Sequence, residues 1–238
     1  MNNNEMKEQG YVYRHELKFF VPERELCLIE NKIAQLCRRD IHTGERGIYN
    51  IRSIYFDTFD DRYLKETENG VDNRKKYRIR IYNKNADIIK LECKRTERGM
   101  KAKEFCDITR EQCIQLMQGN IMIPCEREQK VLQQLQYEHM RYLLEPKVIV
   151  EYMRTPFVYD VGNVRITFDR NIASSHYIKH FFDDTLQKRM VTTEGYNILE
   201  VKYDEMLPYT ILELLRECAP LRRVSFSKYV MSRKNSLR

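Results

Sequence analysis

The segment that decides the fold is Asn73–Asn83, NRKKYRIRIYN, which alternates between two kinds of side chain. Arg74, Lys76, Arg78, Arg80 and Tyr82 occupy one set of alternate positions. Lys75, Tyr77, Ile79 and Ile81 occupy the other. Because successive side chains of a β-strand point to opposite faces, this spacing predicts a strand with one basic face and one mainly apolar face.

The same two-residue period continues along the chain on both sides of this segment. Seven further segments show it, and Gly and Pro are too sparse to mark a linker between them. On several of them, an apolar face again lies opposite a face of mixed charge. The eight predicted strands are Tyr13–Val21, Gly47–Asp57, Arg74–Asn83, Asp87–Arg95, Ala102–Ile108, Pro146–Thr155, Gly162–Asp169 and Tyr196–Tyr203.

Helical patterns lie between the predicted strands. Pro22–Arg39 carries Leu26, Ile29, Ile33 and Leu36 at three- and four-residue spacing, and Pro22 suits the start of a helix. The segment Arg170–Glu194 has no clear period and is predicted to be irregular. The remaining predicted helices are Phe59–Glu68, Thr109–Gln118, Glu126–Leu144, Pro208–Cys218 and Phe226–Leu237.

Two architectures suit these elements. The simpler one is an antiparallel sheet with its charged face in water. However, eight long strands leave exposed edges, and the amphipathic helices need an apolar surface to cover. We therefore favour an α+β fold, an eight-stranded antiparallel β-barrel with helices packed outside and charged side chains inside. We expect one domain over residues 11–238 after a disordered segment 1–10.

Composition excludes several classes of protein. The 238 residues carry 42 Lys and Arg against 35 Asp and Glu, a net charge of +7, which favours an anionic partner. No apolar run is long enough to span a membrane, and the N-terminal segment does not resemble a signal peptide. The seven cysteines form no CxxC or CxxH pair, so free thiols in a reducing cytoplasm are expected.

The basic strand faces indicate phosphate binding. Arg78 and Arg80 place two guanidinium groups on one face, a geometry that suits phosphate oxygens. Because buried like charges repel, a barrel lined by Arg and Lys indicates a polyanion inside it. A solvated charged face remains the alternative for the arginines, and a plain ion pair remains the alternative for Glu200. The sequence has no P-loop, Rossmann glycine pattern, HExxH or GxSxG motif.

Seven short segments occur in an order that resembles a known family. They are YRHELKFFV, IRSIYFDT, NRKKYRIRIYN, IKLECKRT, VRITFDR, ILEVKYDEMLP and FSKYV, and together they span about Tyr11 to Arg233. This pattern is similar to the catalytic domain of the vacuolar transporter chaperone (VTC) family. That domain is the polyphosphate polymerase of the triphosphate tunnel metalloenzyme superfamily. The resemblance implies an eight-stranded tunnel lined by basic residues.

The resemblance also implies roles for individual residues. The catalytic set is Lys18, Arg78, Arg80, Glu200 and Lys202, with Glu200 as the ligand of Mn²⁺ or Mg²⁺. The further phosphate-binding set is Lys94, Lys103, Tyr152, Arg154, Arg165, Ser227 and Lys228. The implied binding partners are ATP or another nucleoside triphosphate, polyphosphate and pyrophosphate. Nucleic acid is disfavoured because aromatic stacking platforms are not evident.

The chain departs from the family pattern at two positions. Hydrolytic members of the superfamily begin with an ExExK strand, and here Arg14 stands in place of the first glutamate, before Glu16 and Lys18. Loss of a carboxylate that helps to place a metal and a water favours transfer to another phosphate over hydrolysis. Ser225 stands where the polymerases have a further lysine.

Three functions therefore remain open. Polyphosphate synthesis from ATP is favoured. A tripolyphosphatase or nucleoside triphosphatase would release orthophosphate from the same tunnel. A non-catalytic polyphosphate-binding module would bind the anion without turnover.

Overall fold

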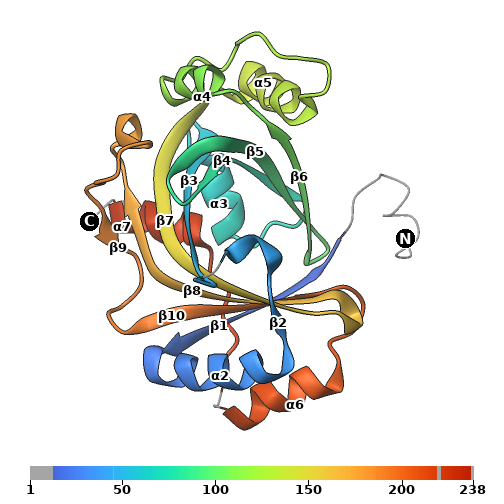
Figure 1. The fold of residues 1–238 in the computed structure, drawn as a ribbon. Coiled ribbons are helices and arrows are strands. Elements are labelled where there is room, and N and C mark those ends of the chain that lie inside the picture. Colours follow the sequence, from blue (N-terminus) through green and yellow to red (C-terminus); the bar gives the residue numbers. More distant parts are fainter. Residues whose placement is uncertain (1–12, 45, 219–220, 237–238) are drawn as a thin grey trace.

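The computed structural model describes residues 13–44, 46–218 and 221–236, and the predicted disordered segment 1–10 lies outside these ranges. Ordered by hydrogen bonding, the principal sheet runs β1-β10-β8-β7-β3-β4-β5-β6, and neighbouring strands are antiparallel. The sheet curls around a central space (Figure 1). Its strands are β1 (His15–Pro22), β3 (Tyr49–Thr58), β4 (Arg74–Tyr82), β5 (Asn85–Glu97), β6 (Met100–Asp107), β7 (Leu144–Tyr159), β8 (Val164–Ser175) and β10 (Tyr196–Tyr203).

The predicted α+β tunnel is confirmed, but the sheet does not close into a full barrel, because its two edge strands are barely joined. Among the described residues, the edge strands β1 and β6 are joined by one bridge, between Arg14, which directly precedes β1, and Lys101, and their backbone groups exchange hydrogen bonds of 2.9 and 3.0 Å. Further along β1, Phe19 forms a bridge with Arg223 instead. The segment before the last helix therefore covers part of the open edge of β1.

Tight turns fix the register of the β4–β5–β6 meander. Asn83 and Lys84 have φ of 51° and 57°, and Arg98 and Gly99 have φ of 49° and 76°. Two successive residues with positive φ make the turn type that matches the twist of antiparallel strands. These turns bring Lys76, Lys94 and Lys103 side by side, because Lys76 pairs with Lys94 and Lys94 with Lys103.

Helices cover the outer face of the sheet in two groups (Figure 1). The helices α2 (Glu23–Leu36) and α6 (Tyr209–Cys218) pack their apolar side chains on β1, β10 and β8. The helices α4 (Arg110–Met117) and α5 (Lys130–Tyr142) pack on the outer face of β4, β5 and β6. Burial of both apolar surfaces leaves the charged faces of these strands turned inward.

A third apolar cluster fills one part of the central space. It includes Leu64 from α3 (Arg62–Glu68) and Tyr229 and Val230 from α7 (Lys228–Ser236), packed on inner-face residues such as Tyr55 and Val150. The interior is therefore partly apolar, whereas we predicted charged side chains there. The short elements are β2 (Arg38–Arg39), β9 (Arg189–Met190), and the 3-10 turns η1 (Ile41–Thr43), η2 (Val161–Asn163) and η3 (Ile178–His180).

One predicted irregular segment is partly regular. The strand β8 continues through Ser175, although Arg170–Glu194 was predicted to be irregular. Asn171 has φ of 54°, and the register with β7 shifts opposite it, between Glu151 and Met153. This bulge interrupts the two-residue period, which explains why the sequence pattern ends before the strand does. No helix in the described part of the chain is long and apolar enough to cross a membrane.

Candidate functional site: a basic tunnel

Basic side chains outnumber carboxylates on the inner face of the sheet. The register places Lys18 opposite Glu200 and Arg78 opposite Glu92, so these residues share that face. The carboxylates at its centre are Glu16, Glu92, Asp169 and Glu200, called the inner carboxylates below, and all four are buried or nearly so. The inner cations are Lys18, Lys76, Arg78, Arg80, Lys94, Lys101, Lys103, Arg154, Lys202 and Lys228.

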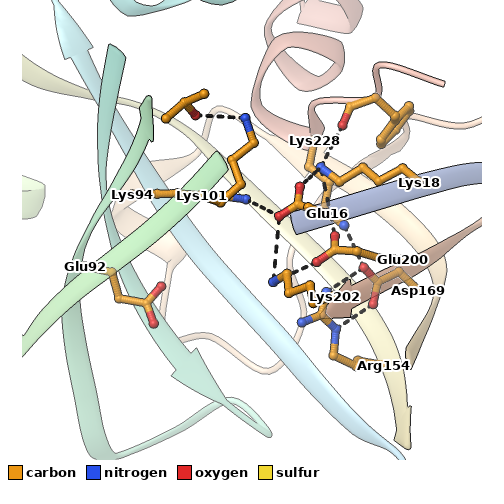
Figure 2. A network of polar contacts seen from close by, with 12 residues as sticks. Glu16, Lys18, Glu92, Lys94, Lys101, Arg154, Asp169, Glu200, Lys202 and Lys228 are labelled. Atoms are coloured by element: carbon orange, nitrogen blue, oxygen red, sulfur yellow. Dashed lines mark hydrogen bonds and ion pairs between the residues drawn. The ribbon is translucent and has the colours of Figure 1, made fainter. Parts of the chain in front are cut away.

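Glu16 and Glu200, which we call the acid pair, share their lysine partners (Figure 2). Lys18 Nζ lies 2.8 Å from Glu16 Oε1 and 3.9 Å from Glu200 Oε2. Lys202 Nζ lies 2.8 Å from Glu200 Oε1 and 3.9 Å from Glu16 Oε2. Lys94 Nζ completes the network at 2.8 Å from Glu16 Oε2. The two strands β1 and β10 therefore hold two carboxylates within one field of ammonium groups.

The lysines keep the acid pair ionised. Burial alone would raise the pKa of Glu16, but Lys18 and Lys94 outweigh it and hold that pKa well below its ordinary value. Burial likewise opposes ionisation of Glu200, and Lys202 and Lys18 again bring its pKa well down. Lys18 faces both carboxylates, and together they raise its pKa despite burial. At neutral pH Glu16, Glu200 and Lys18 are therefore charged.

A second cluster is centred on Glu92, across the central space from the acid pair (Figure 2). Arg78 Nε and Nη2 lie 2.7 and 2.6 Å from Glu92 Oε2, and Lys103 Nζ lies 3.1 Å from Oε1. Arg80 Nη1 is farther from that carboxylate, at 3.8 Å. Arg80 instead donates to Ser53 Oγ at 3.3 Å and to the Tyr152 hydroxyl at 3.4 Å. Arg80 is thus the less neutralised of the two guanidinium groups.

Asp169 holds a third cluster together. Arg154 donates to its two carboxylate oxygens at 2.6 and 2.7 Å, and Lys228 Nζ lies 2.6 Å from Oδ2. Lys228 also lies over the Tyr152 ring, 4.7 Å from the centroid. The cations bring the pKa of Asp169 below its ordinary value although burial opposes this. The cluster links β7 and β8 to the first residue of α7.

The start of α7 supplies polar groups to the tunnel. The backbone oxygen of Phe226 accepts a hydrogen bond from Lys18 Nζ at 3.0 Å, and Ser227 Oγ accepts one from Lys76 Nζ at 3.3 Å. Tyr229 stacks on Tyr55 with 5.3 Å between ring centroids. The predicted pair Ser227 and Lys228 is therefore brought to the same interior as the strand residues.

Arg165 lies apart from these clusters. It faces inward beside Lys202 in the register, but its Nη2 lies 2.9 Å from Asp40 and 3.2 Å from the Tyr49 hydroxyl. Its side chain is 34% exposed. All the other predicted site residues join one of the three clusters or the start of α7.

Sequence reasoning left five inner residues out of the site. They are Glu16, Lys76, Glu92, Lys101 and Asp169. Glu16, Lys76, Glu92 and Asp169 are in predicted strands, so strict use of the two-residue period would have placed them on the inner face. Lys101 directly precedes the predicted strand Ala102–Ile108, whereas β6 begins at Met100. The register with β7 adds that Asp169 lies opposite Arg154.

Arg14, which replaces the first glutamate of the hydrolase pattern, is occupied elsewhere. Its Nε lies 2.8 Å from Asp204 Oδ1, and its Nη2 donates to the backbone oxygen of Asn163. The side chain is therefore fixed by groups that follow β10 and precede β8.

Among the described residues, no group of three or more His, Cys, Asp or Glu side chains is arranged to hold a metal ion. The acid pair is the arrangement closest to a hard-metal donor set, because it offers two ionised carboxylates. Mg²⁺ is commonly bound by one or two carboxylates together with substrate phosphates. The acid pair fits a metal that shares its coordination with a bound phosphate chain.

The curled antiparallel sheet and its cationic interior define a tunnel-type protein built to hold a polyanion. A family model described as the VTC domain matches residues 13–237, and the chain belongs to that family. The resemblance stated from the sequence is thereby confirmed. No curated protein matches the chain.

Solved structures with the same fold are distant in sequence. A candidate adenylyl cyclase from Hippeastrum, described as having a dominant triphosphatase activity, has a TM-score of 0.56 at 13% identity, covering 93% of this chain and 96% of that chain. A candidate adenylate cyclase from Bacillus halodurans has a TM-score of 0.50 at 16% identity, covering 87% of this chain and 88% of that chain. At these identities the likeness concerns the fold.

Proposed function

We propose that this protein catalyses metal-dependent phosphoryl transfer inside the tunnel, and that it makes polyphosphate from ATP. The observation that carries this proposal is the excess of cations over inner carboxylates on one buried face. Such an excess is unfavourable when the tunnel is empty, because like charges repel in a medium of reduced dielectric constant. A phosphate chain relieves that repulsion along its whole length. Nucleoside triphosphates, polyphosphate and pyrophosphate are the ligands of this chemistry.

The arginines and lysines bind and orient the phosphates in this proposal. The guanidinium group of Arg80 is less neutralised by Glu92 than that of Arg78, so it is better able to bind a phosphate. Lys18 and Lys202 face the acid pair and neutralise charge near the reacting groups. Phosphoryl transfer depends mainly on such positioning and charge stabilisation. We propose the catalytic set Lys18, Arg78, Arg80, Glu200 and Lys202, and the phosphate-binding set Lys94, Lys103, Tyr152, Arg154, Arg165, Ser227 and Lys228.

The acid pair would hold a Mn²⁺ or Mg²⁺ ion together with substrate oxygens. When bound, the ion supplies positive charge that stabilises the transferring phosphoryl group. An acceptor phosphate is ionised at neutral pH, so it needs no strong general base. The chain's own cations keep donor and acceptor phosphates close against their mutual repulsion.

The position of Arg14 supports synthesis over hydrolysis. Where hydrolases have a glutamate, this chain has a cation bound to Asp204. No carboxylate at that position is available to orient a water beside Glu16. The triphosphatase activity described for the Hippeastrum protein makes hydrolysis the second candidate, with orthophosphate as its product.

Product analysis tests the proposal. The protein is incubated with ATP and Mn²⁺ or Mg²⁺, chains are separated on a gel, and orthophosphate is measured. We expect chains that require the metal. Orthophosphate without chains would replace synthesis by hydrolysis, and binding without turnover would reduce the protein to a binding module.

Two variants test the assigned roles. Glu200→Gln keeps the shape but loses a metal ligand, so turnover should fall while tripolyphosphate binding persists. Arg80→Ala removes a guanidinium group and should weaken binding itself. Glu194→Gln and Arg24→Ala are matched controls, because both side chains are exposed outside the tunnel. Full activity in folded Glu200→Gln would remove Glu200 from the mechanism.

A further inference from the structure

Three inner lysines lie together on adjacent strands. Lys76 on β4 pairs with Lys94 on β5, and Lys101 on β6 pairs with Thr96, two residues beyond Lys94 on β5. We call Lys76, Lys94 and Lys101 the lysine cluster. Figure 2 shows Lys94 in contact with Glu16 and Lys101 beside Lys94, with the ammonium group of Lys101 turned to Thr96 instead of Glu16.

The lysine cluster has fewer carboxylate contacts than the rest of the tunnel, because Glu16, which lies 2.8 Å from Lys94 Nζ, is the one carboxylate that contacts it among the described residues. Lys76 Nζ contacts Ser227 Oγ at 3.3 Å, and Lys101 Nζ contacts Thr96 Oγ1 at 3.0 Å. Within the described ranges, neither has a carboxylate partner. Lys94 shares Glu16 with Lys18 and Lys202. Most other inner cations are each held by a carboxylate at 3.1 Å or less, as Arg78 is by Glu92 and Lys228 by Asp169.

The electrostatic balance agrees with this geometry. The pKa of Lys76 lies well below its ordinary value, because burial disfavours its charged form. The positive charges of Lys94, Lys18, Arg74 and Lys101 lower this pKa further. Burial lowers the pKa of Lys101 to about 8, and the positive charges of Lys94, Arg74 and Lys18 contribute to this shift. The negative charge of Glu16 opposes it. The positive charges of these lysines repel one another, and a bound anion would relieve that repulsion.

We propose that the lysine cluster binds the terminal phosphate of a linear phosphate chain and so recognises a free chain end. This inference rests on the proposed function and specifies which part of the substrate occupies this wall of the tunnel. The three ammonium groups would contact the non-bridging oxygens of the end group, and the hydroxyls of Ser227 and Thr96 would add hydrogen bonds.

A terminal phosphate suits this cluster better than an internal one. A terminal group has three non-bridging oxygens, and its second ionisation has a pKa of about 6, so it is close to doubly charged at neutral pH. An internal group of the chain has two such oxygens and a single charge. Ammonium groups without a carboxylate partner, such as those of Lys76 and Lys101, gain most from the ligand group with the most charge and the most acceptors. A cyclic phosphate has no end group and would leave the cluster unsatisfied.

The test compares linear tripolyphosphate with cyclic trimetaphosphate by titration calorimetry at pH 7. The variants are Lys76→Met/Lys101→Met and, as matched controls, Arg80→Ala inside the tunnel and Lys32→Met/Lys179→Met on the exposed surface. We expect the wild type to bind the linear ligand at least about tenfold more tightly than the cyclic one, since charge-assisted hydrogen bonds are strong. Lys76→Met/Lys101→Met should lose about tenfold or more for the linear ligand, and less than about twofold for the cyclic one. Arg80→Ala should weaken both ligands similarly, and the surface variant neither.

The outcomes separate this inference from the proposed function. Equal losses for both ligands in Lys76→Met/Lys101→Met, or none, would overturn end recognition and leave a generic basic tunnel. Wild-type binding of the linear ligand no tighter than sulfate would overturn the proposed function as well. Should Lys76→Met/Lys101→Met fail to fold, the single variant Lys101→Met decides, because this side chain is only partly buried. It must lose more affinity for the linear ligand than for the cyclic one, and equal losses would refute the proposal.

Discussion

Replacement of Asp169 by asparagine should destabilise the protein and at the same time tighten phosphate binding. Asp169 is fully buried and neutralises both Arg154 and Lys228, each through an oxygen–nitrogen contact of 2.7 Å or less. Asp169→Asn keeps the shape of the side chain but leaves those two cations without their carboxylate. The same two cations are proposed phosphate-binding residues, so a ligand gains what the carboxylate no longer supplies.

The magnitude follows from the burial of the cluster. Removal of one partner from a buried ion pair costs about 3–5 kcal/mol of unfolding free energy. For a chain of this size each kcal/mol lowers the melting temperature by roughly 2–4 °C, so a loss on the order of 10 °C is expected. Tripolyphosphate at one hundred times its dissociation constant should raise the free energy of unfolding by about 2.7 kcal/mol, because it binds the folded state. Its dissociation constant for Asp169→Asn should be lower than for the wild type.

Urea unfolding with and without tripolyphosphate measures both effects. Asp160→Asn is the matched control, because Asp160 forms an exposed pair with Arg38 at 2.5 Å, and such pairs contribute about 0–1 kcal/mol. A loss below about 1 kcal/mol in Asp169→Asn would show that the buried cluster is not held by its charges. Unchanged or weaker tripolyphosphate binding in the folded variant would refute competition between Asp169 and phosphate.

Three further expectations concern pH and the attachment of α7. The inner carboxylates have pKa values in the folded state that lie below their ordinary ones. The stability that they contribute is therefore present above about pH 4.5 and is lost as the pH falls further. A urea midpoint that does not change between pH 5 and 3 would contradict this expectation. Lys94 and Lys101 show the opposite case, because their pKa values of about 8 lie below the ordinary 10.5. The unfolded chain therefore binds more protons between these values, so the urea midpoint should rise from pH 8 toward 10, and tripolyphosphate affinity should decline there. Tyr229→Phe removes the hydroxyl that donates to the buried carboxylate of Asp57, so it should lower the free energy of unfolding by about 1–3 kcal/mol. The control is Tyr209→Phe, because Tyr209 is exposed. Equal melting temperatures of the two variants would show that this hydrogen bond does not hold α7 in place.

The alternation of side chains was sufficient to predict most of the fold. In Asn73–Asn83 the apolar positions Tyr77, Ile79 and Ile81 are fully buried under the outer helices, and Arg78 and Arg80 face the interior as expected. The pattern is reliable here because each face meets a different environment. It fails where a bulge shifts the period, as at Asn171, and where α7 and α3 fill part of the interior with residues distant in sequence.

The candidate site was less predictable because its balance of charge depends on register. The sequence places Lys76 and Arg78 on one face but does not tell which of them meets a carboxylate. Pairing with β5 gives Glu92 to Arg78 and Lys94 to Lys76, so two similar cations acquire different environments. The resemblance to the VTC family implied a catalytic role for Arg78 and implied no role for Lys76.

The inner carboxylates have a second consequence for how the tunnel can work. A tunnel lined by cations alone would be costly to fold, because each empty site would contain unrelieved repulsion. Glu16, Glu92 and Asp169 reduce that cost, but each also competes with phosphate for the cations it holds. If the tunnel holds a phosphate chain as we propose, the strongest pairs mark sections where the chain would be bound moderately. Lys76 and Lys101, which have no carboxylate partner among the described residues, mark the section where we expect the firmest binding. The proposed synthesis would need this unevenness, because a growing chain has to be retained at one point and to move elsewhere, which a uniformly basic interior would not provide.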